Sequence, residues 1–396
     1  MKFKIEKNIV TTLLKMSQKQ KKNDILYLSF NQNNSCISCG TQTGFKIFDV
    51  DPIRERFGHH FGGGIGIVET LEKTNVLALV GGGDHPQFLP NKVIIWDDYN
   101  KKPVFEIERR NRIRGVKFNR EILTIINEDC VELFDFKNMT RLRKIKTGDN
   151  VNVVAGLSNQ IKIPFIMTPS IQVGAVQVTE YKGGIERIVK CHKNVIKLIT
   201  PNQETTKFAT CSSQGTLIKI WDVETLLRVK ELRRGSDQSN IYSINFSKDS
   251  KYLVSSSEKG TIHVYSLCDQ FENTKSNLNF MSFVLPKYFS SEWSLFQIPY
   301  ESTGKHMCCI LSDDNQSLSK LLVVDYNGRY VYYKFDLKNM KYQIDKEGSI
   351  LESNDDDNDN DNDSGGNDGN DVNNLNASDN DSVHESRDEE KNPKIV

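Results

Sequence analysis

Two neighbouring arginines are the residues of this chain whose type and placement best suit binding chemistry. Arg233 and Arg234 lie between Glu231-Leu232 and Gly235, in a stretch whose composition predicts an extended segment. Consecutive side chains of an extended segment point to opposite sides, so the two arginines could face different neighbours. Because a guanidinium fork binds phosphate through charge-assisted hydrogen bonds, the segment predicts two anion sites that share one arginine pair.

Matching hydroxyl groups occur on both sides of this pair. In Ser212 to Thr216 and in Ser257 to Thr261, a serine precedes a glycine by three residues and a threonine follows it directly. His192 and His263 could add donors to the two sites. In the alternative interpretation, no anion binds there. The serines and histidines belong to an internal hydrogen-bond network, and the arginines are solvated on a surface connector.

An internal repeat supplies the elements that would position these residues. Short β-rich runs, each ending in an apolar or aromatic residue followed by a polar one, occur at 45–49, 93–97, 131–135, 217–222, 262–266 and 331–336, with a degenerate copy at 175–178. A period of about 40 to 45 residues with four short strands per unit is typical of WD-repeat blades. Trp96-Asp97 and Trp221-Asp222 are the WD dipeptide itself. The chain is therefore predicted to be all-β, a seven-bladed WD40-type β-propeller.

The two ends differ from the repeat. We expect an N-terminal extension over 1–23, the propeller over 24–345 and a disordered, acidic, Asn/Asp-rich tail over 346–396. The 45 residues from Glu352 hold 15 acidic and 3 basic residues, which leaves 49 basic and 37 acidic residues before them. The tail is too polar to offset its ordering entropy by apolar burial. The basic body suggests an anionic partner: nucleic acid, a phosphorylated ligand or a membrane surface.

Catalytic and metal chemistry find little support in the sequence. The glycine-rich segment 62–66 lacks the residues that follow a phosphate-binding loop. The single CxxC, Cys36 and Cys39, has no second ligand pair, so buried reduced thiols are predicted. We predict no catalytic residue, no metal and no cofactor. No apolar run of about 18 residues could span a membrane, and the charged N-terminus does not resemble a signal peptide, so a cytoplasmic chain is expected.

Leu232-Arg233-Arg234-Gly235, with the duplicated turns around it, resembles the PROPPIN family of seven-bladed propellers, whose hallmark is Phe/Leu-Arg-Arg-Gly. The resemblance extends from Asp24 to Leu337. Three segments, 62–69, 81–83 and 90–98, are similar to the branch that contains the human WIPI proteins three and four and their yeast Svp1-like homologue. The segment 287–294 is similar to the one that enters the family's last blade.

The resemblance implies two rim pockets for phosphatidylinositol 3-phosphate and phosphatidylinositol 3,5-bisphosphate. The first would consist of His192, Ser212, Thr216, Lys219 and Arg233, and the second of Arg234, Ser257, Thr261 and His263. Lys219 stands where family members usually have arginine. It keeps the charge but loses the two-pronged fork, which implies a weaker first pocket.

A long insertion is required between the repeats at Tyr265 and Phe335. The resemblance implies that this loop enters the bilayer interface, and its candidate residues are Phe280, Met281 and Phe283. Apolar side chains on an exposed loop are unfavourable in water and favourable among lipid headgroups. Packing of the same side chains against a blade is the alternative.

A protein partner is implied as well. In this branch of the family, the side of blades one and two contacts an autophagy lipid-transfer protein, and the matching residues are Asn31, Pro86 and Phe88. A stiff, partly apolar loop suits a docking surface, although the same loop could simply fill space between strands.

We therefore expect a monomeric, non-enzymatic phosphoinositide effector, recruited peripherally to preautophagosomal, endosomal or vacuolar membranes. The first alternative is a WD-repeat protein-interaction scaffold without lipid binding, in which Arg233 and Arg234 serve a protein. The second is a nucleic-acid binder, which is disfavoured because the basic residues form no stripe with interleaved aromatics. With both arginines on a surface connector, replacing them by threonine should leave folding intact.

Overall fold

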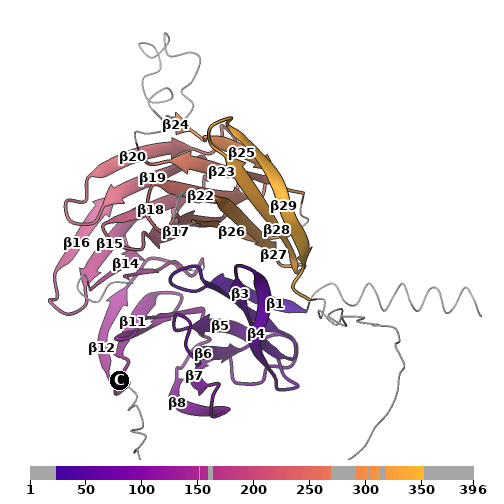
Figure 1. Cartoon of the computed structure of the whole chain (residues 1–396). Helices are drawn as coiled ribbons and strands as arrows, with labels where there is room; N and C mark the ends of the chain where they lie inside the picture. Colours follow the sequence, from indigo (N-terminus) through magenta and orange to yellow (C-terminus); the bar gives the residue numbers. More distant parts are fainter. Residues whose placement is uncertain are drawn as a thin grey trace, which may run out of the picture. The chain divides into compact units, whose positions relative to one another are not determined.

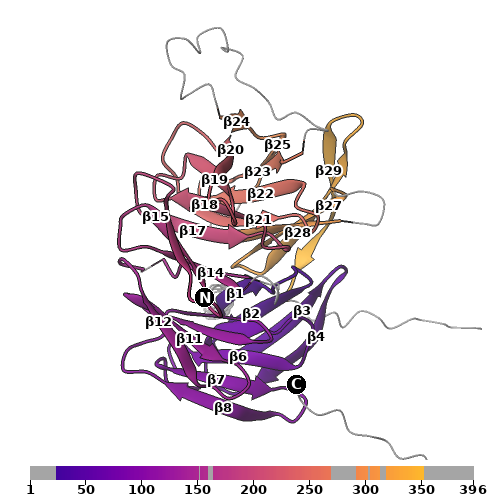
Figure 2. The same ribbon diagram turned by 90° about the vertical axis from the view of Figure 1, so that its left-hand side faces the viewer.

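The computed structural model describes residues 24–150, 152–158, 164–268, 291–301, 304–312 and 318–351. Within these ranges every regular secondary-structure element is a β-strand, and the strands form seven sheets around a central axis (Figures 1 and 2). The prediction of an all-β seven-bladed propeller is confirmed. The expected N-terminal extension lies outside the described residues, as does the acidic segment from residue 352.

Each sheet is one blade, with four antiparallel strands that follow one another in chain order from the inner to the outer edge. Blades one to three comprise β1 (Ile25–Phe30), β2 (Cys36–Thr41), β3 (Gly44–Val50) and β4 (Ile53–His60); β5 (Ile65–Thr70), β6 (Val76–Gly81), β7 (Lys92–Asp97) and β8 (Lys102–Glu108); and β9 (Gly115–Phe118), β10 (Ile122–Ile126), β11 (Cys130–Asp135) and β12 (Arg141–Lys146).

Blades four and five comprise β13 (Gly156–Leu157), β14 (Phe165–Pro169), β15 (Ala175–Glu180) and β16 (Glu186–Lys190); and β17 (Ile196–Pro201), β18 (Lys207–Ser212), β19 (Leu217–Asp222) and β20 (Arg228–Arg233). Blades six and seven comprise β21 (Ile241–Phe246), β22 (Tyr252–Ser257), β23 (Thr261–Ser266) and β25 (Phe296–Pro299); and β26 (His306–Leu311), β27 (Lys320–Asp325), β28 (Arg329–Asp336) and β29 (Lys341–Ser349). A short extra strand, β24 (Glu292–Trp293), pairs in parallel with β20.

The repeated sequence runs are the third strands of the blades: β3, β7, β11, β15, β19, β23 and β28. A third strand has neighbours on both edges and adjacent blades on both faces, so its residues are mostly buried. Continuous burial explains why these strands read as apolar runs, and why the repeat was visible there and not in the exposed fourth strands.

Among the described residues, the ring closes by side-chain packing between blades seven and one, without a shared strand. One apolar cluster joins Met307, Leu322 and Tyr332 to Ile37 and Phe48. The Tyr332 hydroxyl also accepts a hydrogen bond from the Ile53 amide at 3.1 Å and contacts the Val50 carbonyl. Closure therefore depends on apolar contacts of the same kind as those between the other blades.

The two cysteines of the CxxC pair lie on β2 and belong to different apolar clusters. Cys36 packs with Phe45, between blades one and two, and Cys39 packs with Cys309, between blades one and seven. Burial raises the pKa of the Cys39 thiol to about 12. Both side chains are buried free thiols, as predicted.

The propeller extends past the boundary that we placed at residue 345. β29 continues to Ser349, which pairs with Arg329, and Ile350 is buried between blades seven and one. The charged residues of β29 concealed this continuation, because the strand is an exposed outer edge whose pattern is not apolar.

The glycine-rich segments near residues 62–66 and 81–83 are packing positions of blade two. A Cβ atom on Gly81 would lie 1.6 Å from the Phe88 carbonyl oxygen, and one on Gly66 would lie 2.9 Å from the Gly82 Cα. Only glycine permits such backbone approach. These segments hold the loop from Asp84 to Asn91 against the blade.

Candidate functional site

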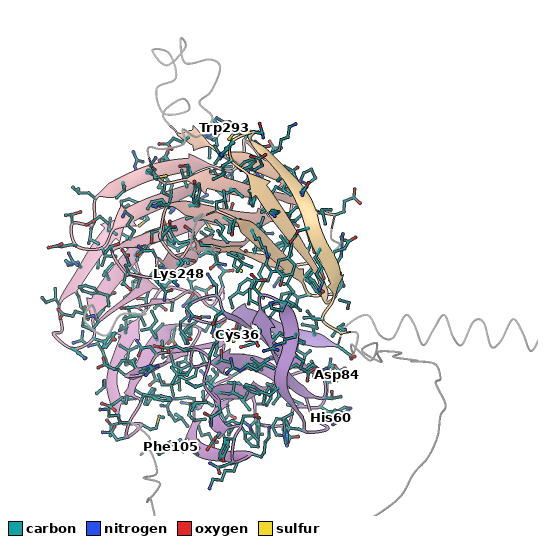
Figure 3. All side chains as sticks on the ribbon, viewed as in Figure 1. Cys36, His60, Asp84, Phe105, Lys248 and Trp293 are labelled. Carbon is teal, nitrogen blue, oxygen red and sulfur yellow. The ribbon has the colours of Figure 1, made fainter. Side chains whose placement is uncertain are left out.

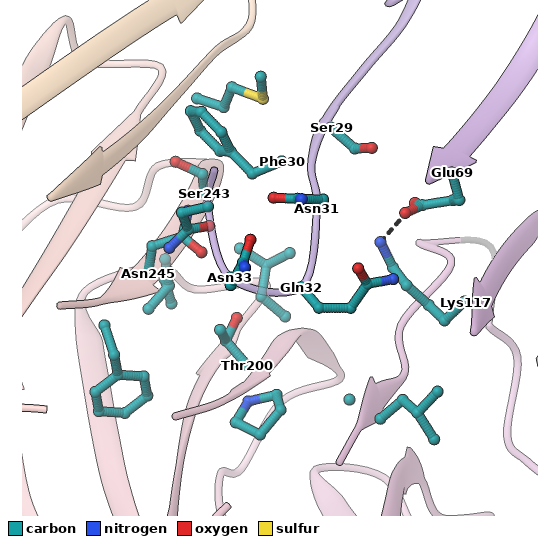
Figure 4. Close-up of a pocket in the computed structure, with 18 of the residues that line it drawn as sticks. Ser29, Phe30, Asn31, Gln32, Asn33, Glu69, Lys117, Thr200, Ser243 and Asn245 are labelled. Carbon is teal, nitrogen blue, oxygen red and sulfur yellow. Dashed lines mark hydrogen bonds and ion pairs between the residues drawn. The ribbon is translucent and has the colours of Figure 1, made fainter. Parts of the chain in front are cut away.

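A cavity of about 670 Å³ runs through the central channel and is lined by the inner strand of every blade. Figure 4 shows its polar wall, where the Glu69 carboxylate faces Lys117. Glu69 accepts hydrogen bonds from Lys117 Nζ at 2.7 Å and from Tyr27 at 2.5 Å. Since these groups satisfy one another, this part of the channel wall serves the packing of blades one to three.

The predicted hydroxyl turns lie in blades five and six and share one backbone geometry. The Gly215 amide donates to the Ser212 carbonyl at 2.9 Å, and the Gly260 amide donates to the Ser257 carbonyl at 3.1 Å. Both glycines have a left-handed backbone, with φ of 63° and 68°. The two segments therefore form the same turn in neighbouring blades, with Thr216 and Thr261 in equivalent places.

Arg233 ends β20 and is largely buried. Its Nε donates to Ser291 Oγ at 2.8 Å, and its carbonyl accepts a hydrogen bond from the Tyr265 hydroxyl at 3.1 Å. Ser291 directly precedes β24, which pairs with β20 beside Arg233. The guanidinium is thus held between the outer edge of blade five and the segment that returns from the insertion.

Arg234 lies in the connector between blades five and six. Its Nε donates to the Gly215 carbonyl at 2.9 Å, and a terminal nitrogen donates to the Asp237 carbonyl. Both acceptors are neutral. Burial lowers the pKa of Arg234, and the positive charge of Arg234 contributes to the lowered pKa of His263. The second arginine therefore brings a buried positive charge to the place where blades five and six meet.

The expectation of a surface connector is wrong for this pair. Arg233 and Arg234 are only 8% and 6% exposed. The sequence shows that the segment joins two blades, but it does not show that β24 and the residues around Ser291 cover the junction.

His192 and Lys219 meet at the first turn. Burial lowers the pKa of His192 to about 4, with a smaller contribution from the charge of Lys219, so its imidazole is neutral near pH 7. Its Nε2 lies 3.0 Å from the Thr210 hydroxyl, which also accepts a hydrogen bond from the Trp221 indole at 2.9 Å. Lys219 Nζ donates to the Cys191 carbonyl at 2.9 Å. His192 therefore takes part in a hydrogen-bond network with Thr210 and Trp221.

The second turn has a comparable set of groups. Burial lowers the pKa of His263 to about 4, with a smaller contribution from the positive charge of Arg234. Its Nδ1 lies 3.1 Å from the Ser294 hydroxyl, and its ring stacks on Tyr265 with centroids 6.1 Å apart. The Ser257 hydroxyl is fully buried and has no hydrogen-bond partner among the described residues. It is one of several buried hydroxyl groups of the described strands and turns that have no hydrogen-bond partner there.

Sequence reasoning missed four residues that support these turns: Thr210, Tyr265, Ser291 and Ser294. Tyr265 was visible only as a repeat position, and it connects both sites because it bonds Arg233 and stacks on His263. Ser291 and Ser294 belong to the segment compared with the entry to the last blade. That comparison is wrong, because β24 joins blade five and β25 joins blade six.

The candidate partner residues do not form one surface. Asn31 is buried at the β1–β2 turn, where its amide bonds Ser35, Cys36 and the Glu72 carbonyl. Pro86 contacts Gly64, before β5, whereas Glu72 follows β5. Asn31 and Pro86 thus lie at opposite ends of that strand.

Phe88 is half-buried. Its ring packs edge-on against Phe61 at 5.6 Å, inside the cluster between blades one and two. Pro86 is exposed. The loop therefore fills space with Phe88 and presents Pro86 to solvent. The candidate membrane-insertion residues Phe280, Met281 and Phe283 lie outside the described residues.

Two general features of the described ranges bear on the chemistry. They contain no helix that could span a bilayer. They also bring together no group of three or more His, Cys, Asp or Glu side chains suited to a metal ion.

Comparison with known proteins gives concordant results. A family model described as PROPPIN matches residues 25–292. SVP1-like protein 2 of Pichia angusta is 32% identical over 342 residues, covering 82% of this chain and 94% of that protein. Autophagy-related protein 18 of Yarrowia lipolytica is 31% identical over 266 residues, covering 61% of this chain and 66% of that protein. The structure of Kluyveromyces lactis Hsv2 superposes with a TM-score of 0.69 at 23% identity, covering 83% of this chain and 99% of that one.

Proposed function

This chain belongs to the PROPPIN family, and from that premise we propose that it is a non-enzymatic phosphoinositide effector with one headgroup pocket in blade five and one in blade six. The observation that carries the proposal is the duplicated turn. Each copy combines a serine and a threonine hydroxyl with a buried arginine and a neutral histidine.

A phosphate monoester suits these groups. It accepts hydrogen bonds from hydroxyl and amide donors, and its negative charge compensates a buried guanidinium. Arg234 has only neutral carbonyl acceptors in its described hydrogen bonds, so an anion there would relieve the unfavourable burial that lowers its pKa. The headgroups proposed are phosphatidylinositol 3-phosphate and phosphatidylinositol 3,5-bisphosphate.

The two pockets are expected to differ in strength. In the first pocket, Lys219 Nζ is 2.9 Å from the Cys191 carbonyl and 3.8 Å from the Glu231 carboxylate. Burial lowers the pKa of Lys219, and Glu231 opposes this effect. The Glu231 carboxylate competes with a phosphate for the lysine, which supports a weaker first pocket.

Membrane recruitment would combine these weak contacts. Two headgroups bound by one chain act cooperatively, because binding of the first holds the second pocket at the membrane. The proposed insertion residues Phe280, Met281 and Phe283 would add apolar contact with the bilayer. The membranes proposed are preautophagosomal, endosomal or vacuolar, with the chain otherwise cytoplasmic and monomeric.

The partner proposed is an autophagy lipid-transfer protein that docks at blades one and two. Support comes from the exposed Pro86 and Leu89 on the loop between β6 and β7. Asn31 would act indirectly, since its hydrogen bonds shape the β1–β2 turn.

Flotation with liposomes of matched net charge tests the proposal. The liposomes contain phosphatidylinositol, its 3-, 4- or 5-phosphate, or the 3,5-bisphosphate, and the wild type is compared with Arg233→Thr/Arg234→Thr. We expect selective binding to the 3-phosphorylated lipids, and loss of it in the variant. Because both arginines are buried, a melting curve must show that the variant is folded, and Arg54→Thr, an exposed arginine of blade one, is the control.

Charge-proportional binding without headgroup selectivity would contradict the proposal. Absence of binding to any of the liposomes would favour the alternative, a WD-repeat interaction scaffold whose arginine pair serves a protein.

A further inference from the structure

A small apolar surface lies on blade four, next to the first pocket. Ile171 and Val173, in the β14–β15 turn, are 67% and 55% exposed, and Val195, before β17, is 41% exposed. We call these three residues the blade-four patch. Three exposed β-branched side chains at the tips of connections are unfavourable in water.

The patch is joined to the first pocket by backbone contacts. The amides of Cys191 and His192 donate to the Gly174 carbonyl at 3.0 and 2.9 Å, which ties the β14–β15 turn to the connector before β17. The Ser213 amide donates to the Val195 carbonyl at 2.9 Å, which ties that connector to the hydroxyl turn. The patch therefore has a fixed position relative to His192 and Ser212.

The corresponding turns of blades one, five and six carry polar residues at their tips, whereas the longer β6–β7 loop of blade two exposes Leu89. Blade one has Gln42 and Thr43, blade five has Ser213 and Gln214, and blade six has Glu258 and Lys259. Blade four alone among these four places isoleucine and valine at that tip. The difference is local to the turn that adjoins a proposed pocket.

Charge around the patch is positive. The segments 170–174 and 190–195 contain Lys190 and Lys193 but no acidic residue, and His192 between them is neutral. Asp149 is the nearest acid along the adjoining connection, whose Gly148 approaches the Ser170 and Ile171 carbonyls. Exposed aliphatic side chains flanked by lysines are suited to the interface of an anionic bilayer.

We propose that the blade-four patch is a membrane-contact site that enters the interfacial region of an anionic bilayer while a headgroup occupies the first pocket. The proposal rests on the proposed phosphoinositide function. The β14–β15 turn is preorganised for insertion: the Ser170 amide donates to the Ala175 carbonyl at 3.0 Å, and the Ala175 amide donates to the Gln172 carbonyl at 3.0 Å. Little ordering is then needed on binding.

The test compares a triple variant of the patch with a double variant elsewhere on the propeller. Ile171→Ser/Val173→Ser/Val195→Ser removes the patch. Val104→Ser/Phe105→Ser removes side chains of β8 that are 47% and 41% exposed and serves as the control. Phe105 lies on the opposite side of the propeller from Trp293, which pairs with Arg233 (Figure 3).

Two readouts are measured for each protein: binding of a water-soluble, short-chain phosphatidylinositol 3-phosphate, and flotation with vesicles of phosphatidylcholine, phosphatidylserine and phosphatidylinositol 3-phosphate. We expect the patch variant to keep its affinity for the soluble lipid and to lose vesicle affinity by roughly tenfold, because three apolar side chains no longer leave water. The control variant should match the wild type in both.

Unchanged vesicle binding by the patch variant, or an equal loss in the control, overturns the inference and leaves the headgroup pockets intact. Loss of the soluble lipid in the patch variant also overturns it, since the patch would then support the pocket itself. A wild type that binds neither form overturns the proposed function, and this inference with it.

Discussion

The turns of blades six and seven have the same backbone and opposite chemistry. In blade seven, the Gly328 amide donates to the Asp325 carbonyl at 3.0 Å, with φ of 89° at the glycine, as in the Ser257 turn of blade six. The Asp325 carboxylate accepts hydrogen bonds from the amides of Asn327 and Arg329 at 2.9 and 3.1 Å. The blade-seven turn is thus internally satisfied, whereas the buried Ser257 hydroxyl has no described partner.

The positive charges differ in the same way. Arg329, which follows the blade-seven glycine, pairs with Glu347 at 2.7 Å, so its charge is compensated within the blade. Arg234 beside the blade-six turn bonds neutral carbonyls. The same turn thus recurs in the propeller, and its side chains determine whether nearby charges are compensated within the chain.

Ser257→Asp, which gives blade six the carboxylate of blade seven, should have the largest effect. A carboxylate at this buried position would occupy the backbone amides and compensate Arg234, so the second pocket should lose headgroup affinity by about 100-fold, or ~3 kcal/mol. Titration with soluble phosphatidylinositol 3-phosphate measures this. Ser257→Ala, which removes only the hydroxyl, is the milder companion variant, and equal affinity in all three proteins would contradict the assignment.

Asp325→Asn should destabilise the fold without changing lipid binding. The amide keeps one acceptor oxygen but weakens the bonds to Asn327, Arg329 and the Tyr300 hydroxyl, which is 3.3 Å away. Losing charge-assisted hydrogen bonds at a buried site costs about 1–3 kcal/mol of unfolding free energy. Urea unfolding measures the loss, and altered headgroup affinity in this variant would show that blade seven contributes to binding.

Acidification should lower the unfolding free energy through the two buried histidines, His192 and His263. The pKa values of His192 and His263 are lowered to about 4 in the folded state, against roughly 6.5 when unfolded. Stability from these groups is present above the unfolded value and is lost as the pH falls toward 4. Between pH 7.5 and 6, each should reduce the unfolding free energy by about 0.8 kcal/mol. His192→Gln/His263→Gln should show a smaller pH dependence than the wild type; an identical dependence would mean that the histidines are charged or exposed.

Lys219→Arg should have the smallest effect. An arginine fork could bind a phosphate with two hydrogen bonds, so the first pocket should gain affinity by a few-fold, about 0.5–1 kcal/mol. The Arg234→Thr background isolates the first pocket for this titration. A loss of affinity would indicate that Lys219 serves mainly to bond the Cys191 carbonyl.

The sequence predicted the blades because their third strands are buried on both faces and recur at a nearly constant period. It also predicted the paired turns, since glycine at a left-handed position between two strands is a local signal. Burial of Arg233 and Arg234 could not be predicted in this way. For Arg233 it depends on β24, which comes from residues far along the chain and has no local pattern that assigns it to blade five. For Arg234 it depends on the approach to the Gly215 turn.

Residues that act through the fold were also missed for a physical reason. Thr210 and Ser294 lie 18 and 31 residues from His192 and His263, so only the folded strands bring them together, and no spacing in the sequence relates them. Asn31 shows the converse. It was chosen for its position in the chain, yet its amide is used within the β1–β2 turn.

Binding stoichiometry tests the central claim most directly. Calorimetric titration of the wild type with soluble phosphatidylinositol 3-phosphate should give two sites per chain, with the blade-five site the weaker. Arg234→Thr should leave one site, and the folded Arg233→Thr/Arg234→Thr variant should leave none. Two sites that persist in the double variant, or a single site in the wild type, would contradict the account of one headgroup pocket in each of the two matching turns.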